Sequence, residues 1–396
     1  MARYDVAKEK LKEEIKEHLT MHMIPFWTSL IDEENGGFYG KVDDHLVVYK
    51  DAVKGCILNS RILWFFSNAY QLLGDSSLLE SATHAYRFLM NQMLDKENGG
   101  VYWALNFDGS ISDDSKHTYN QAFAIYALSS YYKISKEQEA RDTALALFDL
   151  VESKCRDKEG YLEAFDRTFL PVENDKLSEN GIIASKTMNT LLHVFEAYTE
   201  LYHVTLEEKV ADRMRWILDL VATKVYNKEL RRQEVFFDEH MNSLIDLHSY
   251  GHDIEAAWLL DFGLKVLDDD TYKNKLKNII EQLEDHVFEE AFHEDGLDNE
   301  CEDGITDKTR IWWVQAETMV GYFNAFEKRP EKTEYLEVVL KTWDYCKKNL
   351  IDVRERSEWF YEISVDGSRN QEKNVVDMWK CPYHNGRMCF EMIKRV

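Results

Sequence analysis

Six short stretches that combine glycine or acidic residues with apolar, mostly aromatic ones divide this chain into units of similar length. Their central residues are Phe38, Tyr102, Tyr161, Phe236, Leu297 and Phe360. The intervals between these residues are roughly 60 to 75 positions, and a period that uses up the whole chain indicates a repeat architecture. Each unit would contain a helix, a short extended or hairpin segment, and a second helix. The repeat therefore restricts the fold to an array of six helical hairpins.

Apolar residues recur at helical spacing throughout the chain. The segments with this spacing are 4–31, 57–73, 77–95, 117–135, 137–156, 181–203, 206–226, 251–267, 270–290, 309–328, 332–350 and 382–395. Six hairpins can form either an open solenoid or a closed ring. The second helices, such as 57–73, are strongly apolar, whereas first helices such as 77–95 carry charge on one side. This difference is typical of inner and outer rings, so we predict an all-α (α/α)6 barrel with short β-hairpin or loop insertions.

The chain shows no sign of a division into domains or of a membrane segment. It has only 4 prolines and 17 glycines, and no Pro/Ser-rich linker interrupts it, so we expect residues 1–396 to form a single domain. No stretch approaches the roughly 18 to 20 apolar residues that span a bilayer. The 6 cysteines are scattered, without a CxxC pair, as is typical of free thiols in a reducing compartment. We expect a cytoplasmic protein, and a monomer.

The charge of the chain limits its partners. The formal net charge of −25 argues against nucleic acid and anionic membrane surfaces as partners. A neutral small molecule fits this field better than a strongly anionic one. Aromatic residues make up 13% of the chain, which is compatible with stacking on sugars and also with a well-packed core.

Each predicted inner helix carries distinctive side chains near its start, although an unpaired buried polar group costs roughly 1–3 kcal/mol. These side chains are Arg61, His117, Tyr119, Asn120, Asn189, His193, His252, Glu255, Trp312, Trp313, Glu317 and His384. Inner helices of a closed barrel run parallel, so their first turns meet at one end. We predict a single polar cavity there, with helix N-termini directed into it. For any one of these residues alone, a capping or core role is the alternative.

His252 and Glu255 begin one of these helices and share a face, so Glu255 could orient the imidazole. A histidine oriented in this way is a candidate general acid or base. The alternative is an acid that is simply favoured in the first helical turn. Three histidines and a glutamate could also bind Zn²⁺ or Mn²⁺. No two of these histidines lie four residues apart, and the chain has no HExxH motif, phosphate loop or nucleophile elbow, so we expect no metal.

Several ordered segments carry a resemblance to a known family. They are residues 60–64, 116–120, 186–198, 249–255, 312–317 and 379–387. Together they resemble the cellobiose 2-epimerases of the N-acylglucosamine 2-epimerase superfamily, over nearly the whole chain from residue 24 onward. The resemblance implies an (α/α)6 fold and no redox cofactor or metal. It also implies reversible inversion at C2 of the reducing-end sugar of a β-1,4-linked disaccharide, converting cellobiose to glucosyl-mannose and lactose to epilactose.

The resemblance also implies roles for individual residues. His252 and His384 would be the acid/base pair, and His193 would assist proton transfer around the ring oxygen and O1. Arg61 would bind the O1/O2 side of the sugar, and Glu255 would support His252. The residues expected to contact or shape the sugar site are Tyr119, His117, Asn189, Trp312, Trp313, Glu317 and Trp379. Asn59 stands where some relatives have a histidine, so its contact with substrate is left open.

The same residues suit this chemistry without the family name. A C2 hydrogen can be abstracted only after the sugar ring opens, and the resulting enediolate needs fixed positive donors such as Arg61. Inversion then requires a proton on the opposite face of C2, so two bases are needed. Histidines have a suitable ordinary pKa of about 6.5. The alternatives are an aldose–ketose isomerase or N-acylglucosamine 2-epimerase acting on a monosaccharide, a glycoside hydrolase with two opposed carboxylates, and a peptide-binding repeat scaffold.

Overall fold

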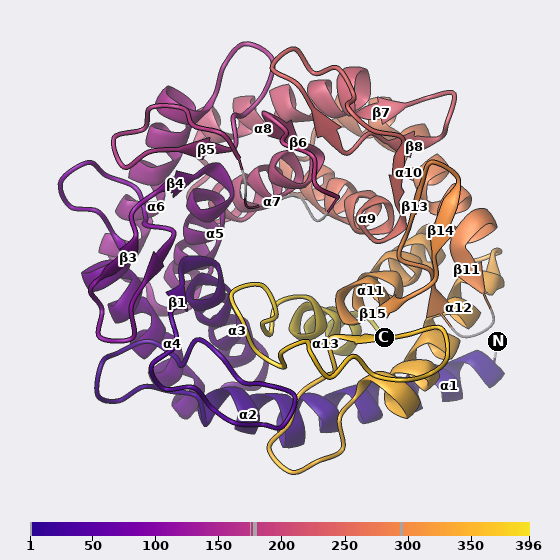
Figure 1. Ribbon diagram of the computed structural model, residues 1–396. Coiled ribbons are helices and arrows are strands. Elements are labelled where there is room, and N and C mark those ends of the chain that lie inside the picture. The colour runs from indigo at the N-terminus through magenta and orange to yellow at the C-terminus, as the bar shows by residue number, and fades with distance from the viewer. Residues whose placement is uncertain (1, 175, 177–179, 294–295) are drawn as a thin grey trace.

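The computed structural model describes residues 2–174, 176, 180–293 and 296–396, and its helices form two concentric rings (Figure 1). The inner ring contains α3 (Cys56–Leu73), α5 (Thr118–Ser135), α7 (Met188–Thr205), α9 (Tyr250–Leu267), α11 (Trp312–Lys328) and α13 (His384–Arg395). The outer ring contains α1 (Ala2–His18), α4 (Ser76–Phe88), α6 (Gln138–Leu150), α8 (Glu208–Leu220), α10 (Asp270–Ala291) and α12 (Thr333–Tyr345). Consecutive inner helices pack on one another, and α13 packs on α3, which closes the ring. The prediction of an (α/α)6 barrel is confirmed.

Several outer helices continue into a π-helical turn. These turns are η1 (Leu19–Met23), η2 (Leu89–Met93), η3 (Val151–Cys155), η4 (Val221–Val225) and η5 (Cys346–Leu350), and the short helix α2 (Ile24–Thr28) follows η1. They account for predicted segments such as 77–95, which extend beyond the regular part of the helix. Within the described residues, no helix has both the length and the apolar character needed to cross a bilayer.

Short strands connect neighbouring units of the barrel. They are β1 (Lys54–Gly55), β2 (Ala104–Leu105), β3 (Ile111–Asp113), β4 (Lys116–His117), β5 (Ala164–Phe165), β6 (Lys186–Thr187), β7 (Tyr226–Asn227), β8 (Arg232–Gln233), β9 (Phe236–Phe237), β10 (Leu247–Ser249), β11 (Phe292–His293), β12 (Gly296–Leu297), β13 (Glu300–Glu302), β14 (Ile305–Asp307), β15 (Arg310–Ile311) and β16 (Glu362–Ile363). The strand before an inner helix pairs antiparallel with a strand of the next unit, as in β1–β2, β4–β5, β6–β9, β10–β13 and β15–β16. A bridge between Val42 and Val376 joins the first unit to the last.

The inner helices approach closely enough that some contacts require glycine. A Cβ on Gly321 of α11 would lie 2.4 Å from a side-chain carbon of Ile254 on α9. Likewise, a Cβ on Gly263 of α9 would lie 2.3 Å from the ring of Phe195 on α7. Both distances are shorter than any real contact, so these two glycines allow the tight inner ring.

A buried ion pair fixes the start of several inner helices. Lys54 Nζ lies 2.6 Å from Asp32 Oδ2, and the side chains of the two residues are 0% and 1% exposed. Lys116–Asp95 at 3.1 Å and Lys380–Glu358 at 2.5 Å are equivalent buried pairs. Lys186–Asp157 at 2.7 Å has the same position in its unit, but its aspartate is 38% exposed. Each pair ties the residues before an inner helix to the hairpin that follows the outer helix of the same unit. The pairs therefore help to hold the helix starts in register around the barrel.

We expect Asp32→Asn to lower the free energy of unfolding by roughly 3–5 kcal/mol, because it leaves the buried Lys54 ammonium without its counter-charge. The measurement is the urea midpoint of the purified variant. Asp51→Asn, at an exposed carboxylate, is the control and should leave the midpoint unchanged. Equal midpoints for the two variants would contradict this role for the ion pair.

Two of the predicted positions are wrong. Helix α7 begins at Met188, not at 181, because Lys186 and Thr187 form β6 and the Thr187 hydroxyl then caps the helix by accepting from the Thr190 backbone N–H. In the fourth unit the hairpin is β7–β8, which ends at Gln233. Phe236 belongs instead to β9, which pairs with β6.

Candidate active site

A cavity of about 210 Å³ opens where the inner helices begin. Its wall includes side chains near the start of every inner helix, which confirms that these helix starts converge. The predicted site residues that line it are Arg61, Tyr119, Asn189, His193, His252, Trp312, Trp313, Trp379 and His384. Three further predicted residues, His117, Glu255 and Glu317, are fully buried outside this lining.

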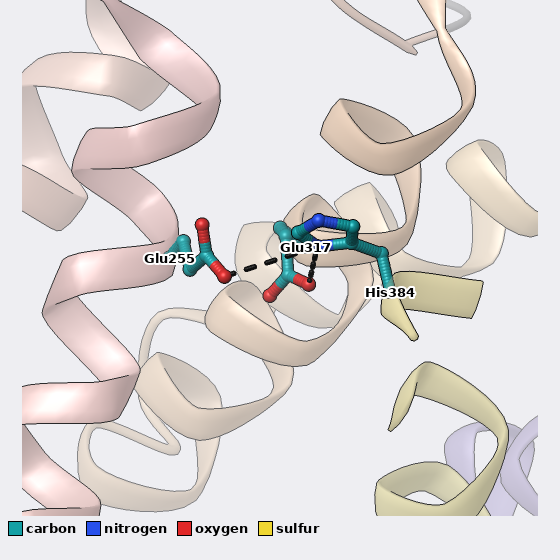
Figure 2. Close-up of side chains that lie close together, drawn as sticks. All are labelled: Glu255, Glu317 and His384. Atoms are coloured by element: carbon teal, nitrogen blue, oxygen red, sulfur yellow. Dashed lines mark hydrogen bonds and ion pairs between the residues drawn. The ribbon is translucent and has the colours of Figure 1, made fainter. Parts of the chain in front are cut away.

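His384 is the first residue of α13 and is held by a carboxylate. Its Nδ1 lies 2.7 Å from Glu317 Oε1 of α11 and 3.8 Å from Glu255 Oε1 of α9 (Figure 2). Burial, together with the nearby Arg387 guanidinium, lowers the pKa of His384 well below its ordinary value. The lowered pKa favours the neutral form of the imidazole, which is the form that can accept a proton.

His252 is held differently from the sequence prediction. Its Nδ1 is hydrogen-bonded to the Ser249 hydroxyl at 2.7 Å. The predicted support from Glu255 is wrong, because that carboxylate points to Arg387 and His384 instead. Burial lowers the pKa of His252 to about 3, so this imidazole is also neutral.

Trp313 lies against both of these histidines. Its ring centroid is 4.7 Å from that of His252 and 5.4 Å from that of His384. The two imidazoles are therefore no farther apart than the sum of these distances, although they come from different helices. A Cβ on Gly251 would lie 2.7 Å from the Trp313 ring, so glycine is needed there to admit the indole.

His193 forms a third imidazole of the wall. Its Nδ1 lies 2.9 Å from Glu196 Oε2, one turn farther along α7. Burial lowers the pKa of His193, while the Glu196 carboxylate opposes this shift. The ring packs edge-on against Tyr119, at 5.2 Å between centroids. Tyr119 in turn links this histidine to the arginine of the wall.

Arg61 is 3% exposed and is fixed by its neighbours. One Nη donates to the Tyr119 hydroxyl at 2.9 Å, and the other to the Trp379 carbonyl at 3.4 Å. The guanidinium lies 4.1 Å from the Phe123 ring centroid. Its Nε has no partner among the described residues. This arginine is therefore a preorganised donor at the cavity wall.

A second arginine, Arg387, lies behind the wall and binds three carboxylates. It donates to Glu196 Oε1 at 2.5 Å, to Glu317 Oε1 at 2.6 Å and also to Glu255 Oε1. Burial opposes ionisation of Glu196, yet Arg387 and His193 lower its pKa to about 2. Burial and the adjacent Glu317 raise the pKa of Glu255 to about 8. One guanidinium therefore sits among three carboxyl groups of unequal acidity.

This cluster includes atoms spaced as metal ligands can be, because Glu255, Glu317 and His384 each offer one atom within 4.8 Å of the others. Arg387 Nη2 donates to both carboxylates, so a guanidinium already supplies the positive charge between them. We therefore interpret the group as carboxylates neutralised by arginine. That the protein uses no metal stays a prediction.

Aromatic and amide side chains complete the cavity. Trp312 packs against Tyr361 at 4.5 Å between centroids, and both line the cavity. Trp379 lies on the side of Tyr119, at 6.0 Å between centroids. Asn189 presents a buried Oδ1 without a partner among the described residues. Flat apolar faces with a few fixed polar atoms are typical of sites for polar small molecules.

Neither His117, a predicted site residue, nor Asn59, whose role was left open, lines the cavity. His117 caps α5 by accepting from the Tyr119 backbone N–H at 3.4 Å, and its Nε2 is hydrogen-bonded to Asn174. The Asn59 amide oxygen accepts from the Phe38 backbone N–H at 3.2 Å and fixes the first hairpin.

The sequence interpretation assigned no role to Ser249, Glu196 or Arg387. Glu196 follows His193 at the spacing that drew attention to Glu255, so the same reasoning could have found it. Ser249 precedes its helix and Arg387 reaches three other helices, so no local spacing marks either contact.

Neutral imidazoles and a fixed guanidinium beside indole faces form a site for acid–base chemistry on an uncharged polar molecule. The fold and the site therefore define an (α/α)6-barrel protein with a cavity suited to acid–base chemistry on such a molecule.

Comparison with known proteins gives the family. The N-acylglucosamine 2-epimerase (GlcNAc 2-epimerase) family profile matches residues 37–385. The chain is 48% identical over 382 residues to a cellobiose 2-epimerase of Ruminococcus albus, covering 96% of this chain and 98% of the relative. It is 46% identical to one from Eubacterium cellulosolvens, with the same coverage of 96% and 98%. The structure of cellobiose 2-epimerase from Bacillus thermoamylovorans superposes with a TM-score of 0.95 at 44% identity, covering 98% of this chain and 100% of that one. The chain belongs to the N-acylglucosamine 2-epimerase family and is a carbohydrate 2-epimerase.

Proposed function

We propose that the chain inverts C2 of the reducing-end glucose of β-1,4-linked disaccharides, converting cellobiose to glucosyl-mannose and lactose to epilactose. The observation that carries this proposal is that His252 and His384, which belong to different helices, both pack against the indole of Trp313. Such a pair can address both faces of one carbon. The relatives named cellobiose 2-epimerase support the choice of a disaccharide.

The reaction begins with opening of the sugar ring. His193 moves the proton between O1 and the ring oxygen, and Glu196 holds its Nδ1 so that Nε2 is free for this exchange. The open chain exposes the C1 aldehyde. Only in this form is the C2 hydrogen acidic enough to be removed by an imidazole.

Inversion follows by transfer of two protons at C2. One histidine of the pair His252 and His384 removes the C2 proton, and the carbon becomes part of a planar enediolate. The other histidine takes up a proton from solvent when substrate binds and, as imidazolium, donates it to the opposite face of C2. The first histidine then releases the proton it removed to solvent, so that both imidazoles are neutral again. Arg61 donates to the enediolate oxygens, where negative charge develops. The indoles of Trp312, Trp313 and Trp379 exclude water that would protonate the intermediate.

The rest of the substrate lies toward the mouth of the cavity. Asn180, Asn299 and Glu300 line the cavity and are partly exposed, and they offer hydrogen-bonding groups for the second sugar. The reaction changes no oxidation state overall, and Arg61 stabilises the charge that develops. We propose accordingly that the enzyme needs no redox cofactor and no metal.

The test is incubation with cellobiose in D₂O followed by carbohydrate NMR. We expect glucosyl-mannose to accumulate and deuterium to enter C2 of both epimers. Lactose, mannose and N-acetylmannosamine are incubated in parallel. A ketose as main product would indicate an aldose–ketose isomerase, and turnover of the monosaccharides alone would contradict the disaccharide assignment.

A further inference from the structure

A continuous chain of hydrogen bonds joins two imidazoles of the cavity through groups behind its wall. His193 Nδ1 meets Glu196 at 2.9 Å, and Glu196 meets Arg387 at 2.5 Å. Arg387 then meets Glu317 at 2.6 Å, and Glu317 meets His384 Nδ1 at 2.7 Å. Arg387 is 2% exposed and does not line the cavity, so any effect it has on substrate must pass through these partners.

The arginine at the centre of the chain determines what the chain can transmit. An arginine side chain keeps its protons in proteins, so Arg387 cannot pass a proton from one carboxylate to the other. It can fix the geometry of both, because its planar guanidinium offers separate Nη atoms to Glu196 and Glu317. The Tyr383 hydroxyl also holds Glu196 and Arg387 together, because it donates to Glu196 and accepts from Arg387.

We propose that Arg387 is a positioning residue that holds His193 and His384 in one fixed arrangement through their carboxylates and keeps both imidazoles neutral before substrate binds. The roles of the two imidazoles in turnover rest on the proposed function, whereas their arrangement and protonation do not. Through Arg387, His193 and His384 are therefore both neutral before substrate binds, although they have different roles in the proposed reaction.

The charges around the two histidines indicate the direction of the effect. Charged or titratable groups from every inner helix face these two histidines. They are Arg61 (α3), Tyr119 (α5), Glu196 (α7), His252 and Glu255 (α9), Glu317 (α11), Tyr383 (just before α13) and Arg387 (α13). Burial is the largest cause of the lowered pKa of His384 and of His193, and the positive charge of Arg387 lowers both further. Removing that charge leaves the negative charge of Glu196 without its arginine partner, so both imidazoles should gain a proton at higher pH.

The first test measures the histidines directly and does not depend on turnover. Imidazole NMR titrations of the substrate-free protein are recorded for the wild type, Arg387→Lys and Arg387→Met. We expect the His193 and His384 transitions to move to higher pH by about one unit or more in Arg387→Met. They should move little in Arg387→Lys, which keeps the charge. Unchanged transitions in a folded Arg387→Met protein would overturn the proposal.

Kinetics test the geometric part of the proposal. In Arg387→Lys we expect the kcat for C2 exchange to fall by roughly 10- to 100-fold with KM within about twofold, because lysine cannot hold two carboxylates in one plane. Glu196→Gln weakens the hydrogen-bond chain at His193 with little change in side-chain volume. It should likewise lower kcat and leave KM nearly unchanged. Lys394→Met, at an exposed position near the end of the same helix, is the control. An increase in KM alone would show that Arg387 affects only binding and would overturn the positioning role.

The combination separates this proposal from the function itself. If the wild type exchanges no C2 hydrogen with any sugar, the proposed function fails while the NMR titrations still decide the role of Arg387. If Arg387→Met does not fold, Arg387→Lys and Glu196→Gln carry the test. Wild-type kcat in both of these variants would overturn it.

Discussion

Replacing His252 or His384 with alanine is expected to lower the rate of net C2 inversion by about 10³-fold or more. Each histidine serves one face of C2, so neither can replace the other. Both rings lie at the cavity wall, and alanine leaves the helix starts intact. The measurement is the appearance of glucosyl-mannose from cellobiose, followed by NMR in D₂O.

The two variants should differ in the exchange that remains. A variant with one base can still remove and return the C2 proton on a single face, and therefore exchanges only one of the two epimers. We expect His252→Ala and His384→Ala to retain slow exchange with opposite epimers. His45→Ala, at an exposed histidine outside the cavity, is the control. Exchange with the same epimer in both variants, or near wild-type inversion in either, would contradict the two-base assignment.

The barrel could be predicted from the sequence because repetition and helical periodicity are local properties. Six similar units, each with a more apolar second helix, specify a closed ring whatever the details of its loops. Helix boundaries were less predictable where long-range contacts decide them. The start of α7 is set by the Lys186–Asp157 ion pair and the Thr187 cap, whereas helical spacing alone indicates a segment that begins at 181.

The convergence of polar helix starts was also predictable, because parallel inner helices must bring their first turns together. Which side chains pair within the cavity was not. Spacing placed Glu255 beside His252, but Arg387 competes for that carboxylate from another helix. Local spacing shows which groups can meet, and a charged partner distant in sequence decides which of them do. The positions of these partners follow only from the closed ring.

Arg61→Met is expected to lower kcat by roughly 10²- to 10³-fold with a smaller effect on KM. The guanidinium is held in place before substrate arrives by Tyr119, the Trp379 carbonyl and the Phe123 ring. It therefore donates most strongly where negative charge appears on the enediolate, and contributes less to binding of the neutral sugar. Methionine keeps most of the packing on Phe123 and removes the donors.

Tyr119→Phe separates the position of Arg61 from its charge. This change deletes the hydroxyl that accepts from Arg61 but leaves the guanidinium in the cavity, so we expect a loss in kcat of only about 10-fold. Steady-state kcat and KM with cellobiose, and binding of the non-reacting alcohol cellobiitol, are measured for both variants. If Arg61→Met weakens cellobiitol binding as much as it lowers kcat/KM, the arginine binds the ground state and the enediolate equally. Its contribution would then be to substrate binding, and another group would have to stabilise the charge that develops when the C2 proton leaves.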